Sequence, residues 1–243
     1  MTIMTTTAMD PDTTIAQADD SALLPLMLWL SPAFPVGAFA YSHGLEWAAE
    51  AGDIVDARSL EAWLIDLLEC GAPRADAILF GVAFRLAEAR DWPALLDANA
   101  LAVALAPSSE RRLETTAQGS AFVSAARGAW DCEPLRRLAE APDERIAYPI
   151  AVAAAASGHG LAPKPSVQAF TLALIANLVS AAVRLGLIGQ SDGQKILAAL
   201  LPHIRALANE AANASLSDLG GSAFRSDIAA MRHETQYSRL FRS

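Results

Sequence analysis

Apolar residues recur along this chain with the period of an α-helix. Leu60, Trp63, Leu64, Leu67 and Leu68 fall at i, i+3, i+4, i+7 and i+8, which places them on one helical face. Similar segments run from near Pro73, from Asp91 to before Pro107, from Ser108 or Ser109 to Gly128, from about Pro134 to Glu140, from Pro149 to Gly158, from Ser166 to Leu185 and from Ser191. No window alternates apolar and polar residues as a strand does. The pattern predicts an all-α protein of roughly nine or ten helices.

Local signals predict where some of these helices begin and end. Asp56 or Ser59 is expected to cap the helix that carries Leu60, and Ser166 is expected to cap a later one. Pro202 is expected to kink or break the helix that starts at Ser191, because proline removes a backbone N–H. Residues 216–221 are expected to form a loop.

The pattern also divides the chain into three parts. Residues 1–20 are rich in Thr, Asp, Met and Ala without apolar periodicity, so a disordered leader is expected there. No composition shift marks a linker within residues 21–223, which favours a single compact helical domain. Residues 224–243 are set apart by their charge and form a predicted C-terminal interaction tail.

Composition supports a globular protein outside the membrane. Hydrophobic residues make up 53% and charged residues 19% of the 243 residues. The mean hydropathy of +0.28 comes mostly from alanine, and the most apolar stretch, residues 172–183, is short and contains Asn177 and Ser180. The stretch is therefore expected to be a buried helix. A secretory signal requires a positively charged N-terminal region, but no Lys or Arg precedes Arg58. A cytoplasmic protein is therefore expected.

Charge and cysteine content exclude several kinds of site. The net charge of −9 and the pI near 4.9 argue against nucleic acid as a partner, since phosphate neutralisation needs a basic face. Cys70 and Cys132 are far apart and in no CxxC spacing, which argues against a disulfide framework or a thiolate metal site. Both are expected to be buried or half-buried thiols.

The C-terminal tail departs from this acidic background. From Phe224 to the end, the chain has four arginines and two acidic residues, Asp227 and Glu234, which gives a local charge of +2. The rest of the chain must therefore carry −11 to give the net charge of −9. Arg, Tyr and Phe are residue types that anchor protein interfaces, which favours a docking element. The alternative is a terminal helix packed on its own body through Ile228, Met231, Leu240 and Phe241.

A second unusual segment is the loop from Ser31 to Glu46. Pro32 and Pro35 enforce extended backbone, and Gly37 and Gly44 permit tight turns. The segment is either a stiff connection between helices or a preformed recognition loop. His43 lies within it and is more readily a hydrogen-bonded structural residue than a metal ligand, because no second His or Cys stands at ligand spacing.

No catalytic or metal-ligating residues are predicted. His233-Glu-Thr-Gln-Tyr237 begins like the zinc-protease HExxH motif but has Tyr in place of the second histidine. Phosphate-binding, dinucleotide-binding and GxSxG motifs are also missing from the sequence. The charged run that contains Glu110, Arg111, Arg112 and Glu114 is expected to form a solvated helix face with i,i+4 pairing.

Together, three segments of the chain resemble the family of the urease accessory protein UreF. They are Ser31-Pro-x-x-Pro-Val-Gly-x-x-x-Tyr-Ser-x-Gly-Leu-Glu46, Asn177-Leu-Val-Ser-Ala-Ala-Val-Arg-Leu185 with Gly189-Gln190, and Met231-Arg-His-Glu-Thr-Gln-Tyr-Ser-Arg-Leu-Phe-Arg-Ser243. The resemblance covers nearly the whole chain after the leader. One departure is Leu187-Ile188, where a proline is expected before the Gly-Gln pair.

The resemblance implies a non-catalytic, dimeric, all-helical scaffold. Such a scaffold joins the accessory protein UreD to the GTPase UreG and helps them load nickel into apo-urease. Nickel is then handled by the assembly, with no cofactor bound directly to this chain. The tail would become ordered on partner binding, with Arg239 supporting recruitment of the GTPase. The implied partner-binding residues are Arg232, His233, Glu234, Tyr237, Ser238, Arg239, Leu240 and Phe241 in the tail, and Pro35, Gly37, Tyr41, Ser42 and Glu46 in the loop.

Two rival functions remain open. A nickel-binding metallochaperone would need several ligands in close spacing, and four scattered histidines are a poor supply. An all-α small-molecule-binding protein, or an enzyme, would use the segment from Phe34 to His43 as a pocket wall and would need convergent polar groups.

Overall fold

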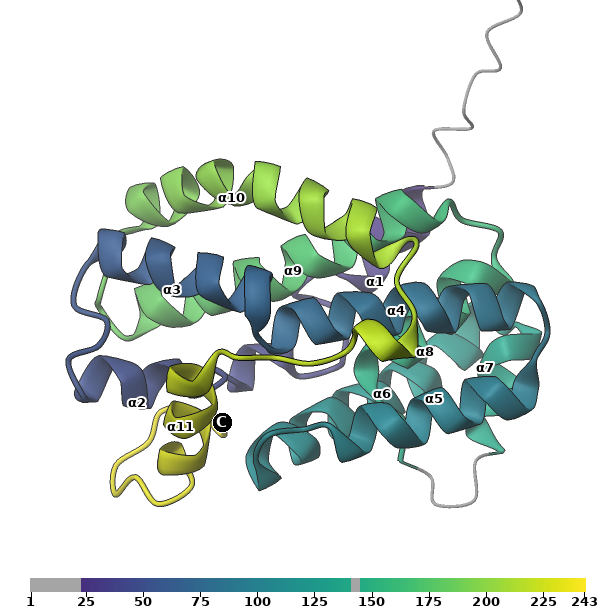
Figure 1. Ribbon diagram of the computed structural model, residues 1–243, viewed down its shortest axis with the longest axis horizontal. Helices are drawn as coiled ribbons and strands as arrows, with labels where there is room; N and C mark the ends of the chain where they lie inside the picture. The colour runs from purple at the N-terminus through teal and green to yellow at the C-terminus, as the bar shows by residue number, and fades with distance from the viewer. Residues whose placement is uncertain (1–22, 141–144) are drawn as a thin grey trace, which may run out of the picture.

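The computed structural model describes residues 23–140 and 145–243, and its secondary structure there is helical (Figure 1). The predicted leader, residues 1–20, lies outside the described residues. The helices are α1 (Leu24–Trp29), η2 (Ala38–Ala40), α2 (Leu45–Glu50), α3 (Ala57–Cys70), α4 (Ala72–Glu88), α5 (Trp92–Ala104), α6 (Ser109–Ala129), α7 (Glu133–Ala139), α8 (Tyr148–Gly158), α9 (Pro163–Arg184), α10 (Gln190–Ala211), η3 (Leu216–Asp218) and α11 (Phe224–His233).

The all-α prediction is confirmed. The described ranges hold eleven α-helices and two short 3-10 helices, η2 and η3, and no strand. Helix α4 runs through the middle of the molecule and contacts α3, α5, α8, α9 and α10. Helices α3, α9 and α10 lie on one side of it, and α5 to α8 gather on the other (Figure 1). Helix α11 packs on α2 and α6 at one end, which brings the C-terminal segment beside the loop that precedes α2 (Figure 1).

Helix starts follow the predicted caps in most cases. Asp56 accepts a hydrogen bond from the Ser59 N–H and caps α3, and Asp91 and Ser108 cap α5 and α6. The prediction for Ser166 is wrong, because α9 begins earlier, at Pro163. The Ser166 hydroxyl instead donates 2.7 Å to the carbonyl of Ala162. Proline is favoured in a first helical turn, where its missing N–H costs nothing, and Pro163 and Pro165 supply the start.

Of the kink or break expected at Pro202, the break does not occur, and the kink stays a prediction. Helix α10 continues from Gln190 to Ala211 with Pro202 inside it. Both Pro202 and Ala198, whose carbonyl loses its helical donor, lie on the exposed side of α10. That carbonyl can be satisfied by water, which lowers the cost of the proline. The expected loop over residues 216–221 is helical in its first half. There η3 begins with a capping box, in which Ser215 is the N-cap and Asp218 is its partner.

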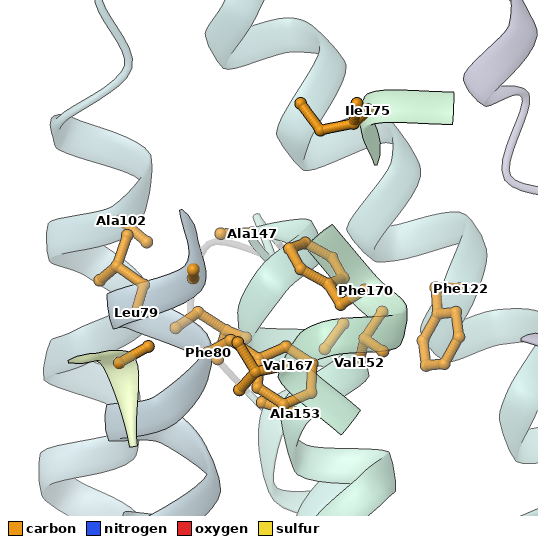
Figure 2. Packing of buried hydrophobic residues seen from close by; sticks show 14 of the residues in the cluster. Leu79, Phe80, Ala102, Phe122, Ala147, Val152, Ala153, Val167, Phe170 and Ile175 are labelled. Carbon is orange, nitrogen blue, oxygen red and sulfur yellow. The ribbon is translucent and has the colours of Figure 1, made fainter. Parts of the chain in front are cut away.

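The core is built where α4, α8 and α9 meet (Figure 2). The rings of Phe80 and Phe170 lie 5.2 Å apart between centroids, and the alanines of α8 are buried. Gly119 lets α6 approach the segment before α8, because a Cβ there would lie 1.9 Å from the Ile146 carbonyl oxygen. The alanine-rich composition therefore serves close helix packing.

Helix α9 is the one described helix long and apolar enough to cross a membrane by length and composition. It packs along α10 and also contacts α4 and α8, and half of its most apolar window is buried within the molecule. The predicted buried helix over residues 172–183 is thus part of a core helix. Such helices pass the same test of composition as membrane spans.

The two cysteines are free thiols, as predicted. Cys70 is half-buried and Cys132 is buried against Gly158. Burial raises the pKa of the Cys132 thiol. A raised pKa keeps the thiol protonated and unreactive.

Candidate partner-binding site

The loop before α2 is shaped by three residues in left-handed backbone conformations. Gly37, His43 and Gly44 have φ values of 73°, 57° and 76°. Asn177 of α9 fastens the loop, because its side-chain amide donates to the carbonyls of Ala38 at 3.0 Å and of Tyr41 at 3.3 Å. The loop therefore has a defined shape set by its own glycines and by α9.

The end of the tail runs beside this loop. The backbone N–H of Arg242 donates 2.8 Å to the Ala40 carbonyl, and the N–H of Ser42 donates 2.7 Å to the Ser243 carbonyl. The Ser42 hydroxyl donates to the same Ser243 oxygen. Phe241 is buried, with 4% of its surface exposed. The two segments singled out in the sequence are thus in direct contact.

Glu46 holds the tail through backbone amides. Its carboxylate accepts from the N–H of Leu240 at 2.7 Å and of Phe241 at 2.9 Å. An ionised acceptor makes these hydrogen bonds stronger than neutral ones. Glu46 lies in the first turn of α2, directly after the loop. Its position explains why a carboxylate follows the Gly-Leu pair in the sequence.

His233, at the end of α11, is fully buried between two carboxylates. Its Nδ1 lies 2.6 Å from Glu110 Oε2, and its Nε2 lies 3.3 Å from Glu46 Oε2. Arg239 donates 2.7 Å to the other oxygen of Glu110. Glu110 and Glu46 therefore join α6 and α2 to the end of α11 and to residues 239–241 of the tail.

Glu234 joins the tail to α6 in another way. Its carboxylate accepts 2.7 Å from the backbone N–H of Ser109, in the first turn of α6, where helix N–H groups lack intrahelical partners. Hydrogen bonding from Ser109 lowers the pKa of Glu234. The carboxylate also complements the positive end of the helix dipole.

Behind the tail lies a buried charged network centred on Glu114. Glu114 accepts from His43 Nε2 at 2.7 Å, from Gln118 at 2.9 Å and from the Ser243 hydroxyl at 2.9 Å, and it pairs with Arg111. Burial alone would raise the pKa of Glu114, but the Arg111 charge and hydrogen bonds from His43 and Arg111 outweigh it and lower the pKa to about 2. Burial and the Arg111 charge lower the pKa of His43.

The expectation of a solvated face at this run of charges is wrong. Arg111 and Glu114 are only 7% and 2% exposed, because α6 turns them inward toward α4 and the loop. Asp76 of α4 lies 3.8 Å from Arg111, and burial raises the pKa of Asp76 to about 6 despite that cation. The lone-histidine interpretation of His43 as a hydrogen-bonded structural residue is confirmed.

The predicted site residues fall into two groups. Ser42, Glu46, His233, Glu234, Arg239 and Phe241 converge where the tail meets the body. Tyr41 is buried next to them, whereas Pro35 and Gly37 lie on the outer part of the loop, away from these contacts. The exposed members of the whole set are Pro35, Arg232, Tyr237, Ser238, Arg239 and Leu240. Sequence reasoning missed Glu110, Glu114 and Arg111, because charged residues at a helix start ordinarily indicate solvent.

The tail does pack on the body, but of the apolar residues expected to do so in the alternative interpretation, most are exposed. Of Ile228, Met231, Leu240 and Phe241, only Phe241 is buried. Ala229, Ala230 and His233 form the inner face of α11. Phe224, Ile228 and Met231 are 68%, 54% and 50% exposed at i, i+4 and i+7. Helix α11 therefore presents an apolar stripe to solvent, and Tyr237 and Leu240, in the segment after α11, are exposed as well.

Two features of the described residues bear on ligand binding: the absence of a metal-ligand cluster and a cavity that buried polar groups reach. Within the described ranges, no group of three or more His, Cys, Asp or Glu side chains could hold a metal ion. A cavity of about 210 Å³ lies between the loop, α6 and α9, and His43, Asp76, Arg111 and Glu114 reach its wall. The fold and the site define an all-helical protein with an exposed apolar surface carried by a latched C-terminal tail.

Comparison with known proteins identifies the family. Residues 54–201 match the family model UreF. The urease accessory protein UreF of Methylobacterium radiotolerans is 54% identical over 220 residues, covering 90% of this chain and 96% of the relative. That of Xanthobacter autotrophicus is 55% identical over 222 residues, covering 91% of each. That of Rhodopseudomonas palustris strain BisB5 is 49% identical over 241 residues, covering 98% and 99%. The chain belongs to the UreF family of urease accessory proteins.

Proposed function

We propose that this chain is a non-catalytic scaffold of urease maturation in the cytoplasm. It bridges UreD and UreG and assists nickel insertion into apo-urease, with nickel handled by the assembly. The single observation that carries the proposal is the tail: polar side chains such as His233 and Arg239 latch to the body, while the large apolar side chains other than Phe241 face solvent. A surface of that kind buries apolar area only when a partner covers it.

The tail is the proposed docking element for the accessory partners. Phe224, Ile228, Met231, Tyr237 and Leu240 supply the aromatic and aliphatic anchors typical of interface hot spots. Arg239 lies beside them, with its guanidinium paired to Glu110. The ordering of the tail on partner binding stays a prediction, since in the single chain the tail already packs against α2 and α6.

A different face suits a second copy of the chain. Leu24, Met27 and Leu28 of α1 are exposed by 57%, 70% and 54%. Met27 lines an open apolar groove between α1, α9 and α10, together with Leu172, Ala173 and Leu201 among others. We assign the homodimer interface to this groove, which leaves the tail free.

Met27→Glu is expected to shift sedimentation from dimer to monomer, and an unchanged sedimentation coefficient contradicts the assignment.

The test of the proposal uses two variants and their binding to UreD and UreG. Arg239→Ala should leave the helical fold and the dimer intact yet weaken assembly by about tenfold, the usual effect of an interface arginine. Arg239→Lys should not restore it, because an ammonium cannot reproduce the guanidinium fork. Pull-down of UreG at the wild-type level by Arg239→Ala would contradict the proposal.

Truncation of residues 232–243 separates docking from folding. It removes the last two residues of α11, Arg232 and His233, and everything after them, while the largest buried side chains of the core remain. Partner binding should fall more than the melting temperature. Collapse of the fold would instead favour a purely structural tail.

One observation supports a second function, that of a small-molecule-binding protein. The cavity of about 210 Å³ joins apolar walls, such as Phe34 and Phe170, to the buried polar network. Equilibrium dialysis with nickel, and thermal-shift screening with small metabolites, distinguish a scaffold from a metallochaperone or a ligand carrier. Binding of either class by the isolated chain would favour the rival functions.

A further inference from the structure

Arg184 stands where three separate segments meet. It is the last residue of α9, and its Nε lies 3.3 Å from the Ser180 carbonyl of the same helix. One terminal nitrogen donates to the carbonyl of Phe39 in the loop. The guanidinium also lies over the ring of Phe241, 4.5 Å from the ring centroid. A single side chain thus contacts α9, the loop and the tail.

The contact with Phe241 has the geometry of a cation–π interaction. A guanidinium within about 6 Å of a ring centroid is attracted to the ring face, and more strongly where water is excluded. Phe241 is 4% exposed, and burial lowers the pKa of Arg184. Arg184 itself is exposed, so its guanidinium covers the buried ring on the outer, solvent-facing side.

The hydrogen bonds of the tail end to Glu46 and to the loop are made by its backbone, whereas Arg184 contacts the ring of Phe241. Glu46 binds the backbone amides of residues 240 and 241, and the loop backbone pairs with residues 242 and 243. Asn177, seven residues before Arg184 on the same face of α9, holds the loop at Ala38 and Tyr41. Helix α9 therefore carries two anchors, one for the loop and one for both loop and tail.

We infer that Arg184 is a positioning residue that fixes the end of the docking tail, residues 240–243, against the loop, residues 38–42. The planar guanidinium can stack on Phe241 and donate to Phe39 at once, which an ammonium cannot do. The inference rests on the proposed function for its consequence in assembly. The positioning itself concerns this chain alone and can be measured without a partner.

Amide hydrogen exchange of the full-length protein tests the positioning. The N–H groups of Ser42, Phe241 and Arg242 are hydrogen-bonded across the contact and report its opening. Arg184→Ala should speed their exchange about three- to tenfold, as loss of a cation–π contact and a hydrogen bond predicts. Arg184→Lys should restore only part of the protection. The matched control is Arg127→Ala, which removes an exposed arginine near the end of α6.

A double-mutant cycle identifies the ring as the target of Arg184. Phe241→Leu keeps an apolar side chain but removes the aromatic face. If Arg184 acts through that face, Arg184→Ala should change the exchange rates less in the Phe241→Leu background than in the wild type. Equal effects in both backgrounds, or exchange rates unchanged by Arg184→Ala, overturn the inference.

Partner binding separates this inference from the proposed function. Arg184→Ala should weaken co-purification with UreD and UreG to the degree that it loosens the tail. A loosened tail with undiminished partner binding supports the positioning role and contradicts the docking role of the tail. Unchanged exchange rates overturn the positioning role whatever the binding result.

Discussion

At the scale of single residues, the buried carboxylate of Glu114 connects the tail to the interior. It receives hydrogen bonds from His43, Arg111, Gln118 and Ser243, which come from the loop, α6 and the tail end. A buried carboxylate is stable as an anion only when such partners replace water. Glu114 therefore makes the position of the tail end sensitive to a single charge.

Replacing Glu114 with Gln should destabilise the fold in a pH-dependent way. Because the folded-state pKa is lowered from 4.5 to about 2, the ionised form contributes stability above pH 4.5 that is lost as the pH falls toward 2. The variant should lose about 3 kcal/mol of unfolding free energy at pH 7. Urea denaturation at pH 7 and pH 3.5 measures the difference, which should shrink at the lower pH. An equal loss at both values would refute the charge argument.

Asp76 should behave in the opposite sense. Its pKa is raised from 3.8 to about 6, so its ionisation costs stability as the pH rises between these values. Asp76→Asn should therefore be more stable than the wild type at pH 7.5, by up to about 3 kcal/mol. The gain should vanish near pH 4. Thermal melts at both pH values test this, and a destabilised variant at pH 7.5 would show that the Arg111 pair outweighs burial.

The residues of this network show where sequence reasoning fails. Ser42, Glu46, His233 and Arg239 were selected through a family resemblance, and the structure brings them together. Glu110, Arg111 and Glu114 were assigned to solvent, because charge at a helix start is ordinarily exposed. Their burial depends on the tail and loop that cover α6, which are distant in sequence. No local pattern carries that information.

At the scale of elements, Gly44 sets how closely α2 and α11 approach. A Cβ at this position would lie 2.5 Å from the backbone nitrogen of Ala230, and the residue has a positive φ of 76°. The close approach places Glu46 within reach of the tail amides. The glycine of the loop motif is thus required by helix packing as well as by its turn.

Gly44→Ala and Gly37→Ala form a matched pair. Both glycines have positive φ, but a Cβ at Gly37 meets nothing within 4 Å. Gly37→Ala should cost about 1 kcal/mol, the price of the backbone conformation alone. Gly44→Ala should cost more and should speed amide exchange in α11, since the clash is with backbone. Equal costs for the two variants would show that α2 and α11 separate freely.

The long helices and the seven-residue α7 were predictable, whereas the six-residue α1 and α2 were not. Helices α3, α5, α6 and α8 follow from apolar spacing and from caps at Asp56, Asp91 and Ser108. The six-residue helices α1 and α2 carry too few turns for a periodic signal. Whether Pro202 breaks its helix could not be predicted, because the cost of a proline depends on which side of α10 faces solvent, and tertiary packing decides that.

At the scale of the whole molecule, charge and apolar surface are divided between faces. The acidic body holds a basic tail through Glu46 and Glu110, and the large apolar side chains of the tail other than Phe241 face solvent. The groove of α1, α9 and α10 forms a second apolar surface. Two separate surfaces suit a chain that pairs with itself and with other proteins at once.

The central claim is that the exposed stripe of α11 docks accessory partners. The most direct measurement is the amount of UreD and UreG that co-purifies with Ile228→Asp/Met231→Asp, beside the control Leu216→Asp on η3. Ile228 and Met231 are half exposed, so the double variant should keep its melting temperature. We predict about tenfold less bound partner for the double variant and wild-type levels for the control. Undiminished partner binding by a folded double variant would contradict the account.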